Sequence, residues 1–322
     1  MSVLTPRDQQ QFKEEGYVVV EDVLDPAQDI APVLAELAEV LDRLATGFVS
    51  EGILASAYRQ LPFADRLTRV HIESRRALSQ YFDISLPQSN VRRDTPMYLG
   101  PAVFRLLTNP RLLDAVQDII GAEIYSNPVQ HIRAKLPRHA VQAGPHNGLV
   151  SKVSWHQDNG VILPEADEAR ILTVWLPLTP ASVENGCLQV IPGSHRAGLE
   201  SHCPTERGVA IPDRLLPANR ARPLPMTPGS LLFMTQRTVH SSLDNTTEAQ
   251  VRVSCDLRYQ PLGEPTGRPA FPGFPARSVA HPNTVRRDPA VWAQSWLDAR
   301  ARLAEHADPV YNRWRADAPV CA

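Results

Sequence analysis

Three residues of this sequence have the types and the spacing of a metal site. His156 and Asp158 lie two residues apart in the segment 155–160, which reads as the end of a strand. An imidazole nitrogen and a carboxylate oxygen at this spacing can reach one metal ion from the same side. A third ligand must then come from another part of the chain, and His240, in the segment 238–242, is the best candidate.

This ligand set favours an iron enzyme over a structural metal site. Two histidines and one carboxylate on one face of an octahedral metal leave three positions open, as in non-haem Fe(II) oxygenases. A structural zinc site is closed by four protein ligands instead. The open positions allow a bidentate cosubstrate and dioxygen to meet on the iron.

A charged cosubstrate also needs an anchor inside the protein. Arg252 follows His240 by twelve residues on the next expected strand. Its guanidinium can hold a carboxylate through a bidentate, charge-assisted pair. Ser242 lies two residues after His240 and therefore shares its strand face, where its hydroxyl can add a hydrogen bond. Arg252 and Ser242 are the candidate cosubstrate-binding residues.

The elements that must position these residues follow a simple order along the chain. Apolar residues at helical spacing, with capping residues before them, predict helices at 5–16, 26–45, 74–81, 110–120 and from 289 onward. Short apolar runs between turn signals predict strands at 17–20, 129–136, 152–156, 171–178, 187–191, 231–235 and 251–259. Helices first, then many short strands, then a helix favour a mainly β fold: a double-sheet jelly roll flanked by N-terminal and C-terminal helices.

Length and charge limit the class of protein. The chain has 322 residues, of which 43% are hydrophobic and 21% charged, so it is globular and we expect one domain over 1–322. We expect a helical part at about 1–125, a jelly-roll core at about 126–262, and a C-terminal loop and helix at about 263–322. The net charge of −2 and the lack of a basic block argue against a nucleic-acid partner.

The sequence also bears on the compartment. The first residues lack the pattern of a signal peptide, and no window approaches the ~18 apolar residues of a membrane span. We therefore expect a cytoplasmic protein without a membrane partner, as a monomer or homodimer. Four cysteines, Cys187, Cys203, Cys255 and Cys321, have no CxxC spacing, and we expect reduced thiols.

Several motifs in a fixed order resemble the phytanoyl-CoA dioxygenase family of Fe(II)/2-oxoglutarate oxygenases. They are FKEEGYVVV at 12–20, HQD at 156–158, WLPL at 175–178, ENGCL at 184–188, PGSH at 192–195, and His240 followed by Arg252. The resemblance covers most of residues 4–260. The ordered combination is far more specific than a single HxD motif.

The resemblance implies a jelly-roll (double-stranded β-helix, cupin-like) core whose iron is held by His156, Asp158 and His240. It implies that 2-oxoglutarate chelates the iron and that its far carboxylate meets Arg252, assisted by Ser242. The implied reaction uses O2, releases succinate and CO2, and hydroxylates a small-molecule substrate, with secondary metabolism as the preferred setting. The gap from His240 to Arg252 is one residue longer than is usual in the family. Arg258 is the alternative to Arg252 as the carboxylate anchor, and it is less favoured.

The resemblance leaves several contacts open. Alternation within 129–136 places His131, Arg133 and Lys135 on one strand face and Gln130 on the other. Gln130, His131 and Lys135 are possible contacts of 2-oxoglutarate or substrate, without a preference among them. Trp175 is equally a core residue and a wall of the substrate cavity. The pocket is expected to be built from the segments 46–100, 197–222 and 262–288.

Other outcomes stay open at this point. The same iron chemistry can give desaturation, epoxidation or cyclisation, and the sequence does not choose among them. A rival of another class is a non-catalytic jelly-roll binding protein, and a third is a metal enzyme of the same fold that needs no 2-oxoglutarate. Asp158 argues against the halogenating relatives, which carry a small residue at that position.

Overall fold

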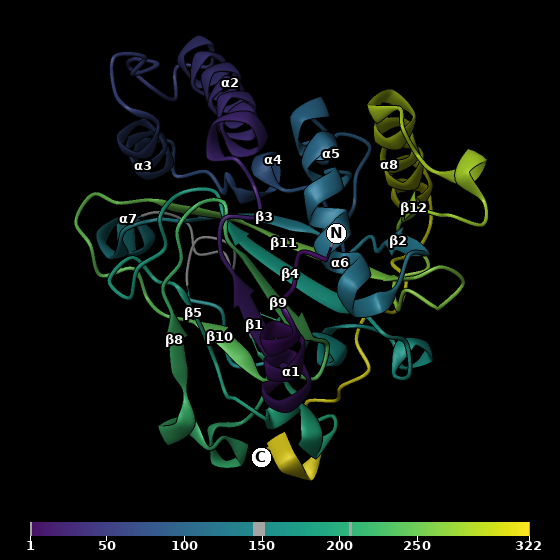
Figure 1. Cartoon of the computed structure of the whole chain (residues 1–322). Helices are drawn as coiled ribbons and strands as arrows, with labels where there is room; N and C mark the ends of the chain where they lie inside the picture. The colour runs from purple at the N-terminus through teal and green to yellow at the C-terminus, as the bar shows by residue number, and fades with distance from the viewer. Residues whose placement is uncertain (1, 144–151, 206–207, 322) are drawn as a thin grey trace.

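The computed structural model describes residues 2–143, 152–205 and 208–321, and in these ranges it has two antiparallel sheets that pack against each other (Figure 1). The larger sheet has the order β1 (Tyr17–Val20), β9 (Leu231–Thr235), β4 (Leu172–Pro177), β11 (Arg252–Pro261), β2 (Ile124–Ser126) and β12 (Phe274–Arg277), and β3 (His131–Lys135) also pairs with β11. The smaller sheet has the order β10 (His240–Ser242), β5 (Leu188–Val190) and β8 (Arg222–Leu224). A separate hairpin joins β6 (Cys203–Thr205) to β7 (Gly208–Ala210). The jelly-roll prediction is confirmed.

Helices cover the outer face of the larger sheet. The α-helices of the described residues are α1 (Pro6–Glu15), α2 (Ala31–Ser50), α3 (Phe63–Ser74), α4 (Ser79–Phe82), α5 (Pro101–Leu107), α6 (Pro110–Ile120), α7 (Arg138–Ala143) and α8 (Pro289–Glu305). Figure 1 shows α2, α3, α5 and α8 on one side of β4 and β11. One apolar core includes residues of these helices and of β4, β9 and β11. The organisation as one domain stays a prediction.

Most helix and strand predictions are confirmed, and the exceptions have local causes. The helix predicted at 74–81 is confirmed only at 79–81, in α4; α3 ends at Ser74, and Arg75 has a left-handed φ of 51° that no α-helix continues through. Helix α1 is capped by Thr5 and ends at Gly16, whose φ of 81° suits glycine. Strand β12 lies in the Pro- and Gly-rich stretch after 261, where no strand was predicted.

Strand β11 divides the chemistry of the protein between its two faces. Val253, Cys255, Leu257 and Tyr259 belong to the apolar core beneath the helices. The residues that alternate with them face the inside of the jelly roll, and among these are the buried polar side chains of Arg252, Ser254 and Arg258. A buried charge is costly unless it has a partner, so this inner face must contain opposite charges or bind them.

The prediction of reduced thiols is wrong for two of the four cysteines. Cys203 of β6 forms a disulfide with Cys321 near the C-terminus, whereas Cys187 and Cys255 are free and buried. The pair could not be predicted from the sequence, because the two cysteines are 118 residues apart and only the folding of the C-terminal tail places them side by side. Figure 1 shows the tail running from α8 back across the molecule to its opposite end.

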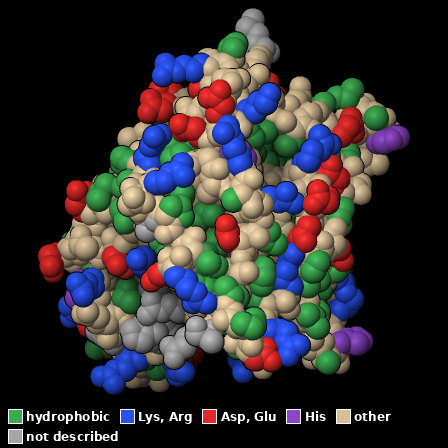
Figure 2. Space-filling view, turned by 90° about the horizontal axis from the view of Figure 1, so that it is seen from below, with side chains coloured by type: hydrophobic (Ala, Val, Ile, Leu, Met, Phe, Trp, Pro, Cys, Tyr) green, Lys and Arg blue, Asp and Glu red, His purple; other side chains and the backbone are tan. Residues whose placement is uncertain are grey.

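Charged and apolar side chains are mixed on the outside. Figure 2 shows Lys and Arg interspersed with Asp and Glu over the face seen from below. Within 2–143, 152–205 and 208–321, no helix combines the length and the apolar character that a bilayer crossing requires.

The disulfide gives a direct test of this tail arrangement. Replacing Cys321 with serine should lower the unfolding free energy by about 2–4 kcal/mol, because the cross-link no longer restricts the unfolded chain. Urea unfolding measures this change. Denatured wild-type protein should expose two thiols to a thiol reagent before reduction and four after it. Four thiols before reduction would contradict the pairing.

Candidate metal centre

Two histidines from distant segments are held side by side by their own backbones. The amide of His156 donates to the carbonyl of His240 at 3.0 Å, and the amide of His240 donates to the carbonyl of His156 at 3.0 Å. Their ring centroids are 4.3 Å apart. The strand predicted at 152–156 is wrong: only His156 pairs as a bridge, and the Ser154 carbonyl accepts from the imidazole of His156.

Both imidazoles are oriented by backbone carbonyls. Nδ1 of His156 lies 2.9 Å from the carbonyl of Ser154, and Nδ1 of His240 lies 3.0 Å from that of Thr238. A carbonyl only accepts, so each Nδ1 carries the proton and each Nε2 is left as a lone-pair donor. Burial, followed by the nearby His240, lowers the pKa of His156 to about 3. His156 is therefore neutral at pH 7, as a metal ligand must be.

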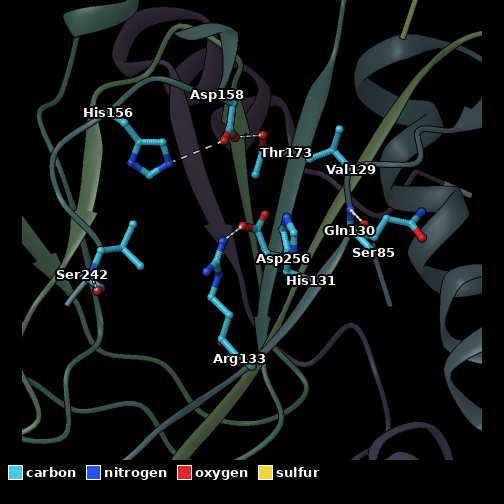
Figure 3. Close-up of polar contacts among 12 residues, drawn as sticks. Ser85, Val129, Gln130, His131, Arg133, His156, Asp158, Thr173, Ser242 and Asp256 are labelled. Carbon is cyan, nitrogen blue, oxygen red and sulfur yellow. Dashed lines mark hydrogen bonds and ion pairs between the residues drawn. The ribbon is translucent and has the colours of Figure 1, made fainter. Parts of the chain in front are cut away.

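Asp158 completes the group at the start of a short 3₁₀ turn, Asp158–Val161. One ligand atom from each of His156, Asp158 and His240 lies within 4.8 Å of the other two. Figure 3 shows the ring of His156 directed at the carboxylate of Asp158, with 3.8 Å between Nε2 and Oδ1. Two imidazoles and one carboxylate, with donor atoms converging on one point, fit a divalent metal ion.

The carboxylate of Asp158 has two further partners that sequence reasoning missed. The hydroxyl of Thr173 donates to Oδ2, and the guanidinium of Arg258 donates to Oδ1. Burial raises the pKa of Asp158, but the guanidinium of Arg258, followed by the nearby His240 and His156, outweighs burial and holds it well below its usual range. Thr173 and Arg258 are direct cross-strand partners in β4 and β11. The available signal was Arg258, an arginine within a strand whose alternate residues are apolar, because a buried arginine requires an anionic partner.

A second polar cluster lies further along the inner face. Lys135 and Arg252 are cross-strand partners, and each is only 1% exposed. Nζ of Lys135 donates to the hydroxyl of Ser242 at 2.6 Å, and Arg252 donates to the hydroxyl of Ser254 at 2.6 Å. Among the described residues, no carboxylate forms an ion pair with either cation, and Nε of Arg252 has no hydrogen-bond partner.

The pKa values express this lack of an anion. Burial, followed by the charge of Arg252, lowers the pKa of Lys135 to about 6. Burial, followed by the charge of Arg133, lowers the pKa of Arg252 to about 10. The cluster of Lys135, Ser242 and Arg252 is thus prepared for a buried anion, which would relieve the cost of the unpaired charges.

The other candidate contacts separate clearly. The side-chain amide of Gln130 donates to the hydroxyl of Ser126 at 2.7 Å, and Figure 3 shows Gln130 pointing away from His156 and Asp158. His131 lies on the face of β3 opposite to Gln130. Its Nδ1 is 2.8 Å from the carboxylate of Asp83. The ring of Trp175 lies under the guanidinium of Arg252, at 5.4 Å from its centroid, within a small apolar cluster between the sheets.

A cavity of about 470 Å³ opens beside His156. His131 and Arg133 line it, and so do Gln88, Val209 and Arg268, one from each of the three variable segments expected to build the pocket. Tyr311 and Asn312 also line it and were not foreseen, because they belong to the C-terminal tail. The cavity has the size of a small-molecule site.

Comparison with known proteins gives one consistent picture. The family model described as phytanoyl-CoA dioxygenase (PhyH) matches residues 12–254. Phytanoyl-CoA dioxygenase domain-containing protein 1 of Danio rerio is 25% identical over 271 residues, which are 79% of this chain and 89% of the relative.

Two other relatives extend this picture. Ectoine dioxygenase of Bordetella parapertussis is 26% identical over 253 residues, covering 73% of this chain and 69% of that enzyme. The structure of the non-heme monooxygenase ThoJ superposes with a TM-score of 0.58 at 19% identity, covering 92% of this chain and 97% of that one.

Proposed function

The chain belongs to the phytanoyl-CoA dioxygenase family, and from this premise we propose that it hydroxylates a small molecule as a non-haem Fe(II)/2-oxoglutarate-dependent dioxygenase. The products besides the hydroxylated substrate are succinate and CO2. One observation carries the proposal: His156, Asp158 and His240 present three ligand atoms within 4.8 Å of one another, and each has a second contact that fixes its orientation.

The three candidate ligands would hold Fe(II) at one face. Bound iron and 2-oxoglutarate together supply the activation of O2 that the protein's own side chains cannot perform. The backbone carbonyls of Ser154 and Thr238 keep the two imidazoles in the tautomer that presents Nε2. Thr173 and Arg258 hold the carboxylate of Asp158 in place and keep it ionised.

We assign the far carboxylate of 2-oxoglutarate to the cluster of Arg252, Lys135 and Ser242. Arg252 is buried with a free Nε, and Trp175 packs against its guanidinium, so the group is fixed before an anion arrives. Arg258, the less favoured alternative, already pairs with Asp158. Lys135, which the sequence offered only as a possible contact, adds a second buried basic group and positions the hydroxyl of Ser242.

We place the substrate in the cavity beside His156. A cavity of about 470 Å³ suits a small molecule. The name of one relative, ectoine dioxygenase, gives a small molecule as its substrate, and this supports a small-molecule substrate for the present protein. A secondary metabolite, a cytoplasmic location and a monomeric or homodimeric state are the finer parts of this proposal.

Succinate formation tests the proposed function. Purified protein supplied with Fe(II), 2-oxoglutarate and O2 should form succinate slowly even without substrate. Replacing His240 with alanine should lower this rate to about one hundredth or less, because the metal loses a ligand. The control is His306→Ala, which removes an exposed histidine at the end of α8. Equal rates in wild type and His240→Ala would show that the proposal is wrong.

The cosubstrate assignment predicts a pH dependence of binding. Lys135 has a pKa of about 6 in the empty site, so it is largely neutral at pH 7. A carboxylate beside it raises that pKa, and binding then takes up a proton. The affinity for 2-oxoglutarate should fall by up to about tenfold per pH unit as the pH rises from 6 to 8.

Calorimetric titration of the anaerobic Fe(II) protein measures this dependence. In Lys135→Met the affinity should change little between pH 6 and 8, whereas the exposed control Lys13→Met should retain the wild-type slope. A slope that persists in Lys135→Met would assign the proton to another group and remove Lys135 from the anchor.

A further inference from the structure

The wall of the cavity beside His156 is unusually basic. Among the described residues that line it, four are permanently or ordinarily cationic, Arg133, Lys152, Arg258 and Arg268, and none is Asp or Glu. The whole chain has a net charge of −2, so this excess does not reflect the composition. A cavity lined with one sign of charge concentrates ligands of the opposite sign.

Two of these cations are already matched by carboxylates. Arg258 pairs with Asp158, and Arg133 lies 4.0 Å from Asp256, which Figure 3 shows beside it below the metal centre. Arg268 differs from both. Its guanidinium donates only to the backbone carbonyls of Val161 and Tyr311, and within the described ranges it has no carboxylate partner.

Arg268 is nevertheless buried and held rigidly. It is 2% exposed, and its guanidinium lies over the ring of Tyr311 at 5.0 Å from the centroid. Burial, followed by the charge of Arg258, lowers the pKa of Arg268 to about 10, so it remains protonated at pH 7. Two guanidinium groups near each other in a buried wall repel, and an anion beside them would remove that cost.

Tyr311 adds a hydrogen-bond donor to the same wall. Its side chain lines the cavity, is 6% exposed, and has a hydroxyl without a hydrogen-bond partner in the described structure. A buried hydroxyl without a partner costs free energy that an oxyanion acceptor would recover. Tyr311 belongs to the C-terminal segment after α8. The disulfide of Cys203 with Cys321 links this segment to β6.

We propose that Arg268 and Tyr311, with Lys152 at the rim, form a subsite for an oxyanion group of the substrate. The substrate is then a small organic acid, a carboxylate or a phosphate ester, bound by its charged end at Arg268 and Tyr311. The rest of the molecule occupies the same cavity, which His156, Val129 and Val161 also line. That the bound anion is the substrate rests on the proposed function, whereas the anion subsite itself is a property of the cavity.

Matched probes test the subsite without knowledge of the substrate. Benzoate, phenyl phosphate and benzyl alcohol share one ring and differ in charge. Calorimetry on wild-type protein saturated with Fe(II) and 2-oxoglutarate, without O2, keeps the probes out of the Arg252 cluster. At least one anion should bind about tenfold or more tightly than the alcohol, as expected for a buried charge-assisted pair. The tighter anion identifies the oxyanion class.

Variants assign that preference to named residues. Arg268→Met should abolish the preference for the anion, Lys152→Met should weaken it severalfold, and Arg43→Met, an exposed change on α2, should leave it intact. Tyr311→Phe removes only the unpartnered hydroxyl and should weaken anion binding severalfold. It keeps the test valid if Arg268→Met fails to fold. Equal binding of anions and alcohol, or a preference that survives both Arg268→Met and Tyr311→Phe, overturns the subsite.

The two levels of inference fail separately. The same titrations without Fe(II) and 2-oxoglutarate, on an Arg252→Met background, report the subsite alone. An Arg268-dependent preference in a protein that makes no succinate would uphold the subsite and reject the oxygenase. Succinate formation in a protein without that preference would do the reverse.

Discussion

The structure depends on one pair of backbone hydrogen bonds between His156 and His240. These residues are 84 positions apart in the sequence, yet each amide donates to the carbonyl of the other at 3.0 Å. The bridge forces the two imidazoles to the same side, and the rings are then turned by the carbonyls of Ser154 and Thr238. The double-sheet fold makes this possible, because the chain leaves the larger sheet after β9, and β10 then pairs with β5 in the smaller sheet. Main-chain contacts therefore set the positions of the two imidazoles, whereas the side chains of Thr173 and Arg258 hold the carboxylate of Asp158.

The inner face of β11 then arranges charge along one line. Near one end Arg258 neutralises Asp158 at the metal centre, and at the other end Arg252 and Lys135 have no carboxylate partner among the described residues. The two ends of this face thus favour opposite charges. One end presents ligand atoms for a cation, and the other has buried basic groups that an anion would stabilise. A dicarboxylic keto acid that chelates the metal with one end and meets Arg252 with the other satisfies both needs with one molecule.

Much of this arrangement could be predicted from the sequence, because it follows from local rules. The HxD spacing, the distal histidine and the strand alternation that puts Lys135 opposite Gln130 are short-range patterns. The partners of Asp158 could not be predicted this way, since Thr173 meets Arg258 only through the register of β4 and β11. The disulfide and the cavity contact of Tyr311 depend on the path of the tail, which no periodicity encodes. The predicted strand at 152–156 is reduced to a single bridge, because among the described residues of this segment only His156 pairs with His240.

The most direct test of the account is the visible spectrum of the anaerobic Fe(II) protein as 2-oxoglutarate is added. If His156, Asp158 and His240 hold iron that 2-oxoglutarate chelates, a weak visible charge-transfer band should appear in wild type. It should be absent in His156→Ala and weaker at equal cosubstrate in Arg252→Ala, which keeps the metal ligands but loses the carboxylate anchor. A wild-type protein that binds Fe(II) yet shows no band at saturating 2-oxoglutarate, or a band that persists unchanged in His156→Ala, would contradict the account.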